Sequence, residues 1–257
     1  TNRWNDEIVD IWFKTKLHNG TELGLGFSHE EPLVSMLKEE IKSYKDLPVA
    51  TYQFQNKFRN ELRAKAGLLR TREFLMKDLY SFHINQQDLE DYYEKVKNAY
   101  SNIFNNLGIG DKTFITFASG GVFSKYSHEY QTICESGEDI IYLDTKKNIA
   151  INKEVFTDEV INELGLDKNN LQEIKSIEVG NIFKLGTKFT HDLDLKVTDE
   201  NGQSVYPLMG CYGIGVARLM ATVVEVYNDE KGITWPEQIA PYKIHLVGLN
   251  LENEVVN

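Results

Sequence analysis

The chain has 257 residues, of which 41% are hydrophobic and 26% charged, and its net charge is −11. This composition is typical of a soluble globular protein with one large domain or two small ones. No apolar run can cross a bilayer and no charged-then-apolar leader opens the chain, so we expect a soluble protein of the cytoplasm or of an organellar matrix. The acidic excess argues against a dedicated nucleic-acid-binding domain, although a local basic patch can still bind phosphate.

The two cysteines, Cys134 and Cys211, exclude a disulfide framework, and neither forms a close pair with another cysteine or a histidine. We therefore expect no metal held by protein side chains. Basic residues are concentrated in one short segment, whose members are Lys57, Arg59, Arg63, Lys65, Arg70, Arg72 and Lys77. Composition alone favours a solvated charged hairpin there over a phosphate-binding patch.

Apolar residues recur at helical spacing from Glu30 to Tyr44, and Pro48 favours the end of that helix. A second amphipathic helix is predicted from about 86 to 107, with Gly108 as its stop signal. Runs rich in aromatic and β-branched residues predict strands, and these lie at 50–60, 72–82, 113–118, 128–134, 138–143, 177–184, 193–198 and 204–210.

Residues 150–175 are interpreted as a small helical excursion, in which Thr157 caps a helix and Gly165 ends it. Asn201-Gly202 is a strong hairpin-turn signal between the last two strands. A last helix is predicted over 215–227. Many hairpin-linked strands with helices gathered in separate stretches predict an α+β fold, an antiparallel β-sheet flanked by helices.

The first two strands form a hairpin with unlike faces. On the first strand, one face suits a core and carries Tyr52, Phe54, Asn56 and Phe58. The other face can line a polar cleft and carries Gln53, Gln55, Lys57, Arg59 and Glu61. On the returning strand, a common face carries Arg72, Phe74, Met76, Asp78 and Tyr80. Arginine, an aromatic ring and a carboxylate together suit a ligand with phosphate, a flat base and an amine.

Three segments of this chain resemble signature motifs of the class II aminoacyl-tRNA synthetases. The second motif, in the form of the bacterial-type prolyl-tRNA synthetases, is similar to Gln55–Arg63 (QNKFRNELR) followed by Arg70–His83 (RTREFLMKDLYSFH). The third motif is similar to Met209–Arg218 (MGCYGIGVAR), and the segment before it to Glu178–Thr187 (EVGNIFKLGT). The resemblance covers nearly the whole chain and implies a class II synthetase-like fold with ATP, Mg²⁺ and L-proline as ligands.

The resemblance implies two catalytic residues. Arg59 would neutralise the α-phosphate of ATP while the substrate carboxylate attacks it. Arg218, near the start of a glycine-opened helix, would contact the γ-phosphate. Phe74 would stack on adenine, and the further ATP contacts implied are Glu61, Arg70, Glu178 and Asn181.

The resemblance also implies a proline pocket. The family has Thr-x-Glu where this chain has Ser28-His29-Glu30, so Ser28 keeps the hydroxyl and Glu30 would bind the imino group. Ser28 and Glu31 equally match a capping box at the start of the first helix, and both interpretations stay open here. The other pocket residues implied are Met76, Asp78, Phe183, Gly213 and Cys211, the last as a small wall and not a nucleophile.

We expect residues 1–241 to form the catalytic core and 242–257 to begin a C-terminal anticodon-binding domain. The family's first motif, which lies at the dimer interface, would precede Thr1, so we expect the full-length protein to be a homodimer that binds the acceptor end of tRNA(Pro). Many bacterial relatives carry an editing insertion where residues 144–176 stand, and this stretch is too short to fold as such a domain.

Two alternative functions remain open. The first is a catalytically weak paralogue or ligand-binding module that keeps the fold, and the second is a threonyl- or seryl-type class II relative. Zinc ligands are usual at a threonyl site. The pairs His128-Glu129 and Glu178-Asp192 are further acidic or histidine-containing constellations. No spacing supports a protein-bound metal there, and we interpret His128 as ordinary sheet surface or core.

Overall fold

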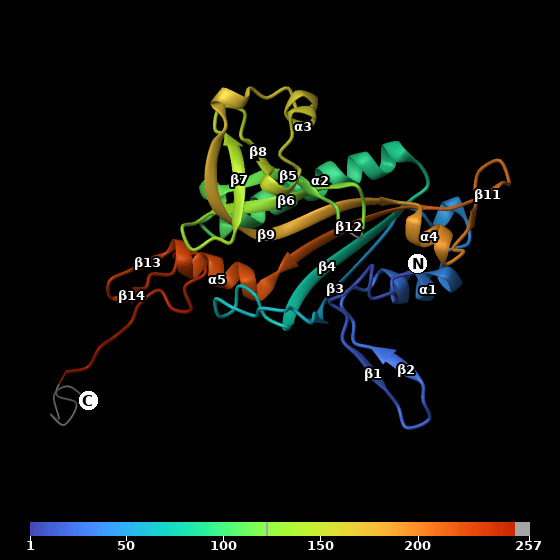
Figure 1. The fold of residues 1–257 in the computed structure, drawn as a ribbon, viewed down its shortest axis with the longest axis horizontal. Coiled ribbons are helices and arrows are strands. Elements are labelled where there is room, and N and C mark those ends of the chain that lie inside the picture. Colours follow the sequence, from blue (N-terminus) through green and yellow to red (C-terminus); the bar gives the residue numbers. More distant parts are fainter. Residues whose placement is uncertain (122, 250–257) are drawn as a thin grey trace.

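A large β-sheet dominates the computed structural model, which describes residues 1–121 and 123–249 (Figure 1). Its eight strands follow the order β3-β4-β12-β9-β6-β5-β8-β7, and only β5 and β8 pair in parallel. The strands are β3 (Val49–Phe58), β4 (Glu73–His83), β5 (Thr113–Ser119), β6 (Tyr126–Ile133), β7 (Asp139–Asp144), β8 (Ile149–Asn152), β9 (Gln172–Gly186) and β12 (Leu208–Gly215). The predicted antiparallel sheet of an α+β fold is therefore confirmed.

The long strand β9 belongs to two parts of this sheet. Residues 180–186 pair with β12, and residues 172–176 pair with β7. On its other side β9 pairs with β6. Because β6 pairs with β5, β5 with β8 and β8 with β7, these strands close with β9 into a small barrel. The open sheet and the barrel thus share one strand.

Helices cover both faces of the open sheet (Figure 1). They are α1 (Glu30–Glu40), α2 (Gln86–Asn106), α3 (Asp158–Glu163), α4 (Lys188–Asp192) and α5 (Val216–Val226). Neighbouring residues of β12 point to opposite faces, so Tyr212 joins the core beneath α2 and α5 while Cys211 joins the core beneath α1 and α4. Within the described residues, no helix combines the length and apolar character that a bilayer crossing needs.

Short elements complete the fold. The β1–β2 hairpin projects away from the body (Figure 1). The short strands are β1 (Lys14–Lys16), β2 (Glu22–Gly24), β10 (Val197–Thr198), β11 (Ser204–Val205), β13 (Asn228–Asp229) and β14 (Gly232–Ile233). Single 3-10 turns occur at Tyr44–Asp46, Gly110–Lys112, Lys153–Val155 and Lys168–Asn170.

Most predicted elements are present with small shifts at their ends. Helix α1 ends at Glu40 and not at Tyr44, because the chain turns into extended backbone at Ile41. The excursion at 150–175 contains only one short α-helix, α3, whose N-cap Thr157 accepts a hydrogen bond from the Val160 N–H. The turn at Asn201-Gly202 closes the β10–β11 hairpin as predicted.

The strand predicted at 193–198 is wrong. Its alternating apolar residues follow the short helix α4, and only Val197–Thr198 pairs as a strand. The strand predicted at 204–210 is divided into β11 and β12, and β12 extends to Gly215 through the glycine-rich segment. Alternation therefore identified residues that are buried, Leu195 and Val197, but not their backbone conformation.

The interpretation of the β3 faces is also wrong in one respect. Tyr52 and Phe54, predicted to face a core, are 71% and 62% exposed. They share a face with Lys77 and Leu79 of β4, but β3 is the outermost strand of the sheet. The polar face is the more buried one, since Lys57 is only 3% exposed.

Candidate active site

A cavity of about 280 Å³ opens on the sheet face opposite α2 and α5. Every residue that the sequence analysis assigned to ATP or proline lines this cavity: Ser28, Glu30, Arg59, Glu61, Arg70, Phe74, Met76, Asp78, Glu178, Asn181, Phe183, Cys211, Gly213 and Arg218. The hairpin, β9, β12 and the first turns of α1 and α5 supply them. Segments far apart in the sequence thus converge on one site.

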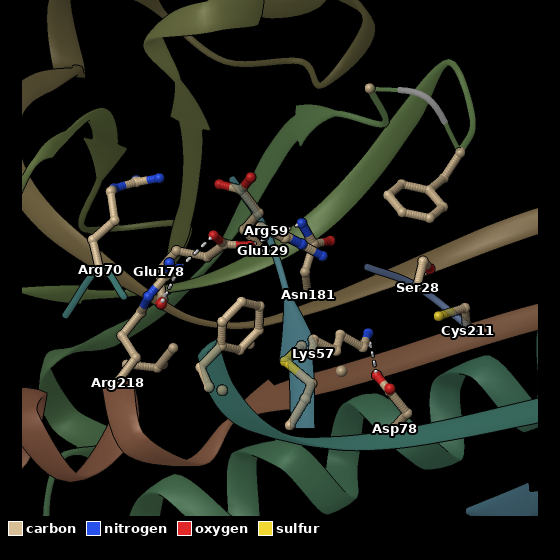
Figure 2. Close-up of a pocket in the computed structure, with 18 of the residues that line it drawn as sticks. Ser28, Lys57, Arg59, Arg70, Asp78, Glu129, Glu178, Asn181, Cys211 and Arg218 are labelled. Atoms are coloured by element: carbon tan, nitrogen blue, oxygen red, sulfur yellow. Dashed lines mark hydrogen bonds and ion pairs between the residues drawn. The ribbon is translucent and has the colours of Figure 1, made fainter. Parts of the chain in front are cut away.

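One end of the cavity carries the guanidinium groups of Arg70 and Arg218 (Figure 2). Arg218 Nη1 lies 3.0 Å from Glu178 Oε2, and Arg70 Nη1 lies 3.4 Å from Glu61 Oε2. The side chains of Arg218 and Arg70 are 28% and 33% exposed. Ion pairs at such exposure contribute little to stability, so these arginines can exchange carboxylate partners for phosphate at low cost.

Arg59 lies between this end and the rest of the cavity (Figure 2). Its guanidinium carbon is 5.4 Å from the centre of the Phe74 ring, and its Nε donates to the Phe27 carbonyl at 3.4 Å. Burial lowers the pKa of Arg59, and Arg218 lowers it further, while Glu178 opposes the shift. The surroundings therefore hold Arg59 as a cation whose charge is incompletely compensated, which favours an anionic ligand.

A β-bulge explains how Glu178 and Asn181 meet in the cavity. Residues three apart on a regular strand point to opposite faces. The β6–β9 register shifts after Tyr130, so that Gly180 faces Tyr130 while Glu178 faces Gln131. This irregularity turns both side chains to the same side, where Asn181 Nδ2 donates to Glu178 Oε1 at 3.0 Å. Asn181 Oδ1 stays buried without a partner among the described residues.

Glu129 on β6 is a site residue that the sequence analysis set aside. It is 8% exposed, and its Oε2 accepts hydrogen bonds from Gln131 at 2.8 Å and Asn152 at 2.9 Å. Burial and the nearby Glu178 charge raise the pKa of Glu129 to about 8. Figure 2 shows Glu129 beside Glu178 and Asn181. A paired carboxylate in the cavity is the signal that could have identified it.

At the opposite end, Lys57 forms a buried ion pair with Asp78, with 2.9 Å between Nζ and Oδ1 (Figure 2). Their side chains are 4% and 1% exposed. Asp78 Oδ2 is buried without a hydrogen-bond partner in the described chain, and His29 Nδ1 is 3.9 Å away. Lys57 was predicted only to lie on the polar face of its strand, and here it fixes one oxygen of a cavity carboxylate.

Ser28 and Glu31 do not form the capping box that the sequence allowed. His29 is the N-cap of α1 and no side chain caps that helix end. The Ser28 hydroxyl instead donates to Glu30 Oε2, and Glu31 pairs with Arg3 at 2.8 Å. Burial raises the pKa of Glu30, but the charges of Arg3 and Lys57 outweigh it, and the pKa lies below its usual value. The capping box is therefore wrong, and Glu30 is a buried carboxylate in the cavity wall.

The remaining walls at this end are apolar or small. Phe183, Met76 and Cys211 line the cavity, and burial raises the pKa of the Cys211 thiol well above its usual value. A protonated, buried thiol is a poor nucleophile, which supports its interpretation as a pocket wall. A Cβ atom at Gly213 would lie 2.5 Å from Met76 Cε, so a larger residue here would displace the end of the Met76 side chain.

The other sequence-derived constellations do not form sites. His128 accepts or donates a hydrogen bond with the Tyr93 hydroxyl at 2.8 Å, and burial lowers its pKa to about 4, as expected for a sheet residue in a packed environment. Asp192 ends α4 and pairs with His191, apart from the cavity that Glu178 lines. Among residues 1–121 and 123–249, no three His, Cys, Asp or Glu side chains gather as a metal site.

This geometry agrees with a comparison against known families. Residues 13–227 match the family described as the tRNA synthetase class II core domain (G, H, P, S and T). The chain belongs to this family. The match contains all the hairpin, β9 and β12 residues of the cavity.

Two curated relatives similar to this chain are named as proline–tRNA ligases. The proline–tRNA ligase of Anaplasma marginale (strain St. Maries) is 39% identical over 253 residues, which cover 92% of this chain and 58% of that protein. The proline–tRNA ligase of Rickettsia akari (strain Hartford) is 38% identical over 249 residues, with the same coverage. The chain therefore spans 58% of the length of these relatives.

Solved structures share the fold. A prolyl-tRNA synthetase of Giardia lamblia in complex with prolyl-adenylate superposes with a TM-score of 0.72 at 19% identity, covering 92% of this chain and 41% of that one. One from Cryptosporidium parvum complexed with L-proline and AMP gives 0.68 at 16% identity, covering 91% and 41%. The class II synthetase-like core fold predicted from the motifs is thus confirmed.

Proposed function

We propose that this chain activates L-proline with ATP, forming prolyl-adenylate for transfer to the 3′ end of tRNA(Pro). One observation carries the proposal: a single cavity has exchangeable arginines at one end and two buried carboxylates, Glu30 and Asp78, at the other. The first end suits a triphosphate and the second suits a cationic nitrogen. The curated relatives named proline–tRNA ligase support the choice of amino acid.

The reaction needs no covalent protein intermediate. The proline carboxylate attacks the α-phosphorus of ATP, a new P–O bond forms, and the bond to the leaving pyrophosphate breaks. Negative charge accumulates around the α-phosphate, and Arg59 is the cation placed between the two ends of the cavity to stabilise it. Phe74 offers its ring to adenine, while Arg70, Arg218 and Glu61 hold the rest of the nucleotide. Catalysis is then positioning and charge neutralisation.

The cavity fits a magnesium ion carried by ATP. Glu178 presents a carboxylate, and Asn181 Oδ1 is a buried oxygen without a partner in the described chain, so these two residues would hold the ion. Oxygen ligands of this kind are the ones that Mg²⁺ prefers. When bound, Mg²⁺ would neutralise charge on the ATP phosphates. The protein itself contributes the arginine cations and the exclusion of water.

The resemblance to this family also supports a proposal for the domains, the oligomeric state and the tRNA contacts of the protein. Residues 1–241 would form the catalytic core, with 144–176 in place of an editing insertion, and 242–257 would begin an anticodon-binding domain. Of that last stretch, residues 250–257 lie outside the described residues. A homodimer of the full-length protein, and binding of the tRNA acceptor end by the exposed basic residues of the hairpin, complete the proposal. The cytoplasm or an organellar matrix would be its compartment.

Proline-dependent exchange between ATP and pyrophosphate tests the proposal. We expect exchange with proline and none with threonine or serine, and the reverse result would contradict it and favour a threonyl- or seryl-type relative. Because a core can bind without turning over, calorimetry with prolyl-sulfamoyl-adenosine is the second measurement. An absence of both exchange and binding would favour a non-catalytic module that keeps the fold.

A further inference from the structure

Arg3 lies buried beneath the carboxylate end of the cavity. Its side chain is 2% exposed, and its guanidinium carbon lies 4.5 Å from the Phe27 ring centre, 5.0 Å from that of Phe123 and 5.2 Å from that of Phe189. Arginine is almost never fully buried unless it is paired. Its partners are Glu30 and Glu31, both through Nη1, so a rigid aromatic cage aims this cation at the first turn of α1.

The two oxygens of Glu30 have different surroundings. Oε2 accepts from Arg3 Nη1 at 3.1 Å and from the Ser28 hydroxyl. The side-chain partner of Oε1 among the described residues is the weak Cys211 thiol, at 3.8 Å. Ser28, Glu30 and Cys211 all line the cavity. One oxygen is therefore anchored from behind, and the other keeps its acceptor capacity for a ligand.

Asp78 repeats this arrangement with a different cation. Its Oδ1 is anchored by Lys57, and its Oδ2 is buried without a hydrogen-bond partner in the described chain. The carboxylate end thus contains two oxygens that lack strong side-chain partners in the described part of the chain, one from each carboxylate. A secondary ammonium carries two N–H donors, whereas a primary ammonium carries three. The number of free acceptors matches the secondary ammonium.

We propose that Arg3 is a positioning residue for amino-acid selection, which holds Glu30 by one oxygen so that the other stays available to the substrate's secondary ammonium. This inference rests on the proposed function. Arg3 acts through Glu30 and touches no substrate itself. The other charged or titratable groups around Glu30 are Glu31, His29, Lys57, Asp78, Tyr80 and Cys211.

The charge of Arg3 also favours the ionised form of Glu30. Burial raises the pKa of Glu30, and among the groups that lower it Arg3 has the largest effect, followed by Lys57 and Ser28. Without Arg3, burial would be opposed less strongly and the pKa of the Glu30 carboxyl would rise. Because the protonated form accepts poorly from an ammonium group, selection would weaken while the shape of the cavity remains.

Two adenylate analogues separate this role from a structural one. Prolyl-sulfamoyl-adenosine carries the secondary ammonium, and cyclopentanecarbonyl-sulfamoyl-adenosine has the same ring size without it. In calorimetry at pH 7.5, we expect Arg3→Met to weaken binding of the prolyl compound by about 10- to 100-fold. This loss corresponds to the free energy of one charge-assisted hydrogen bond. The affinity for the carbocyclic compound should change by less than about 3-fold. Arg3→Lys should recover part of the loss, and Lys146→Met, on the exposed surface, should change neither.

Equal weakening of both compounds would mean that Arg3 only supports the fold, and would overturn the inference. The double variant Arg3→Met/Glu30→Gln removes both buried charges, so it remains informative if Arg3→Met alone fails to fold. Added to Glu30→Gln, the arginine change should alter prolyl binding by less than about 3-fold, and a further 10-fold loss would contradict an action through Glu30. A wild-type chain that binds neither compound would refute the proposed function as well. A wild type that prefers the prolyl compound, with that preference intact in Arg3→Met, refutes the inference alone.

Discussion

The two ends of the cavity hold their charges in different ways. At the arginine end, Arg70 and Arg218 form ion pairs whose side chains are 21–33% exposed. At the carboxylate end, Lys57 and Arg3 pair with Asp78 and Glu30, and all four side chains are at most 4% exposed. Water screens the first pairs, and the protein interior does not screen the second.

This difference suits what each end would bind. An exposed ion pair can open when a phosphate competes for the arginine, and the free carboxylate is then stabilised by water. A buried pair cannot open without a large penalty, so it keeps the shape of a small pocket constant. The cavity therefore combines an adaptable end for a large anion with a fixed end for a small substrate.

Breaking the fixed end should have the largest effect on stability. Lys57→Met leaves Asp78 buried without its partner, and we expect the free energy of unfolding to fall by about 3–5 kcal/mol. Urea unfolding at pH 7.5 measures this. The double variant Lys57→Met/Asp78→Asn should recover most of the loss. A cost below about 1 kcal/mol for the single change would show that the two ends do not differ.

Arg59, which lies between the two ends of the cavity, should have the largest effect on the reaction rate. Arg59→Ala removes the cation that, in the proposed reaction, would face the charge developing on the α-phosphate, so proline-dependent ATP–pyrophosphate exchange should slow by about 10²- to 10³-fold. The exposed Arg63, in the same segment, is the matched control, and Arg63→Ala should leave the exchange rate unchanged. Comparable rates for both variants would remove Arg59 from the mechanism.

The buried carboxyl of Glu129 should make the stability of the fold depend on pH. Its pKa is raised from 4.5 to about 8, so the native state holds a proton that the unfolded chain releases at lower pH. Stability should therefore fall as the pH rises from about 4.5 to about 8. We expect Glu129→Gln, which mimics the protonated form, to stabilise the fold by about 1–3 kcal/mol at pH 8.5 and to have little effect at pH 5. Urea unfolding at both pH values checks this, and equal effects at the two would contradict it.

The smallest effect on stability should come from the adaptable end. Arg70→Met breaks partly exposed pairs with Glu61 and Glu138, and the unfolding free energy should change by less than about 1 kcal/mol. The KM for ATP should nevertheless rise by about 10-fold, while the KM for proline stays constant. An equal rise in both KM values would mean that this end is not dedicated to the nucleotide.

Local patterns predicted most of the elements, and the motif resemblance identified a set of residues that converge on one cavity. Period two alone correctly grouped Phe74, Met76 and Asp78 on one strand face. It could not have joined Glu178 to Asn181, because only a bulge turns both to the same side. Such a bulge depends on the neighbouring strand and leaves little trace in a single sequence.

Other errors arose where distant residues decide a local question. The Ser28 hydroxyl does not form the predicted capping box, because it donates a hydrogen bond to Glu30 instead. The Glu30 carboxylate is paired with Arg3, 27 positions away. Tyr52 and Phe54 alternate like core residues, yet they occupy the outermost strand. Burial there depends on which strand lies at the edge, and that is a property of the assembled sheet.

The sharing of β9 between the open sheet and the barrel has a mechanical consequence. Enzymes that close around substrates by domain rotation bend at a few loop residues between two rigid bodies. Here the backbone passes from one part to the other as a continuous strand of 15 residues, hydrogen-bonded to β6, β7 and β12. A rotation would break several ladders at once. We therefore expect the opposite walls of the cavity to keep a constant spacing during turnover, so that substrate entry is accommodated by side chains and connecting loops.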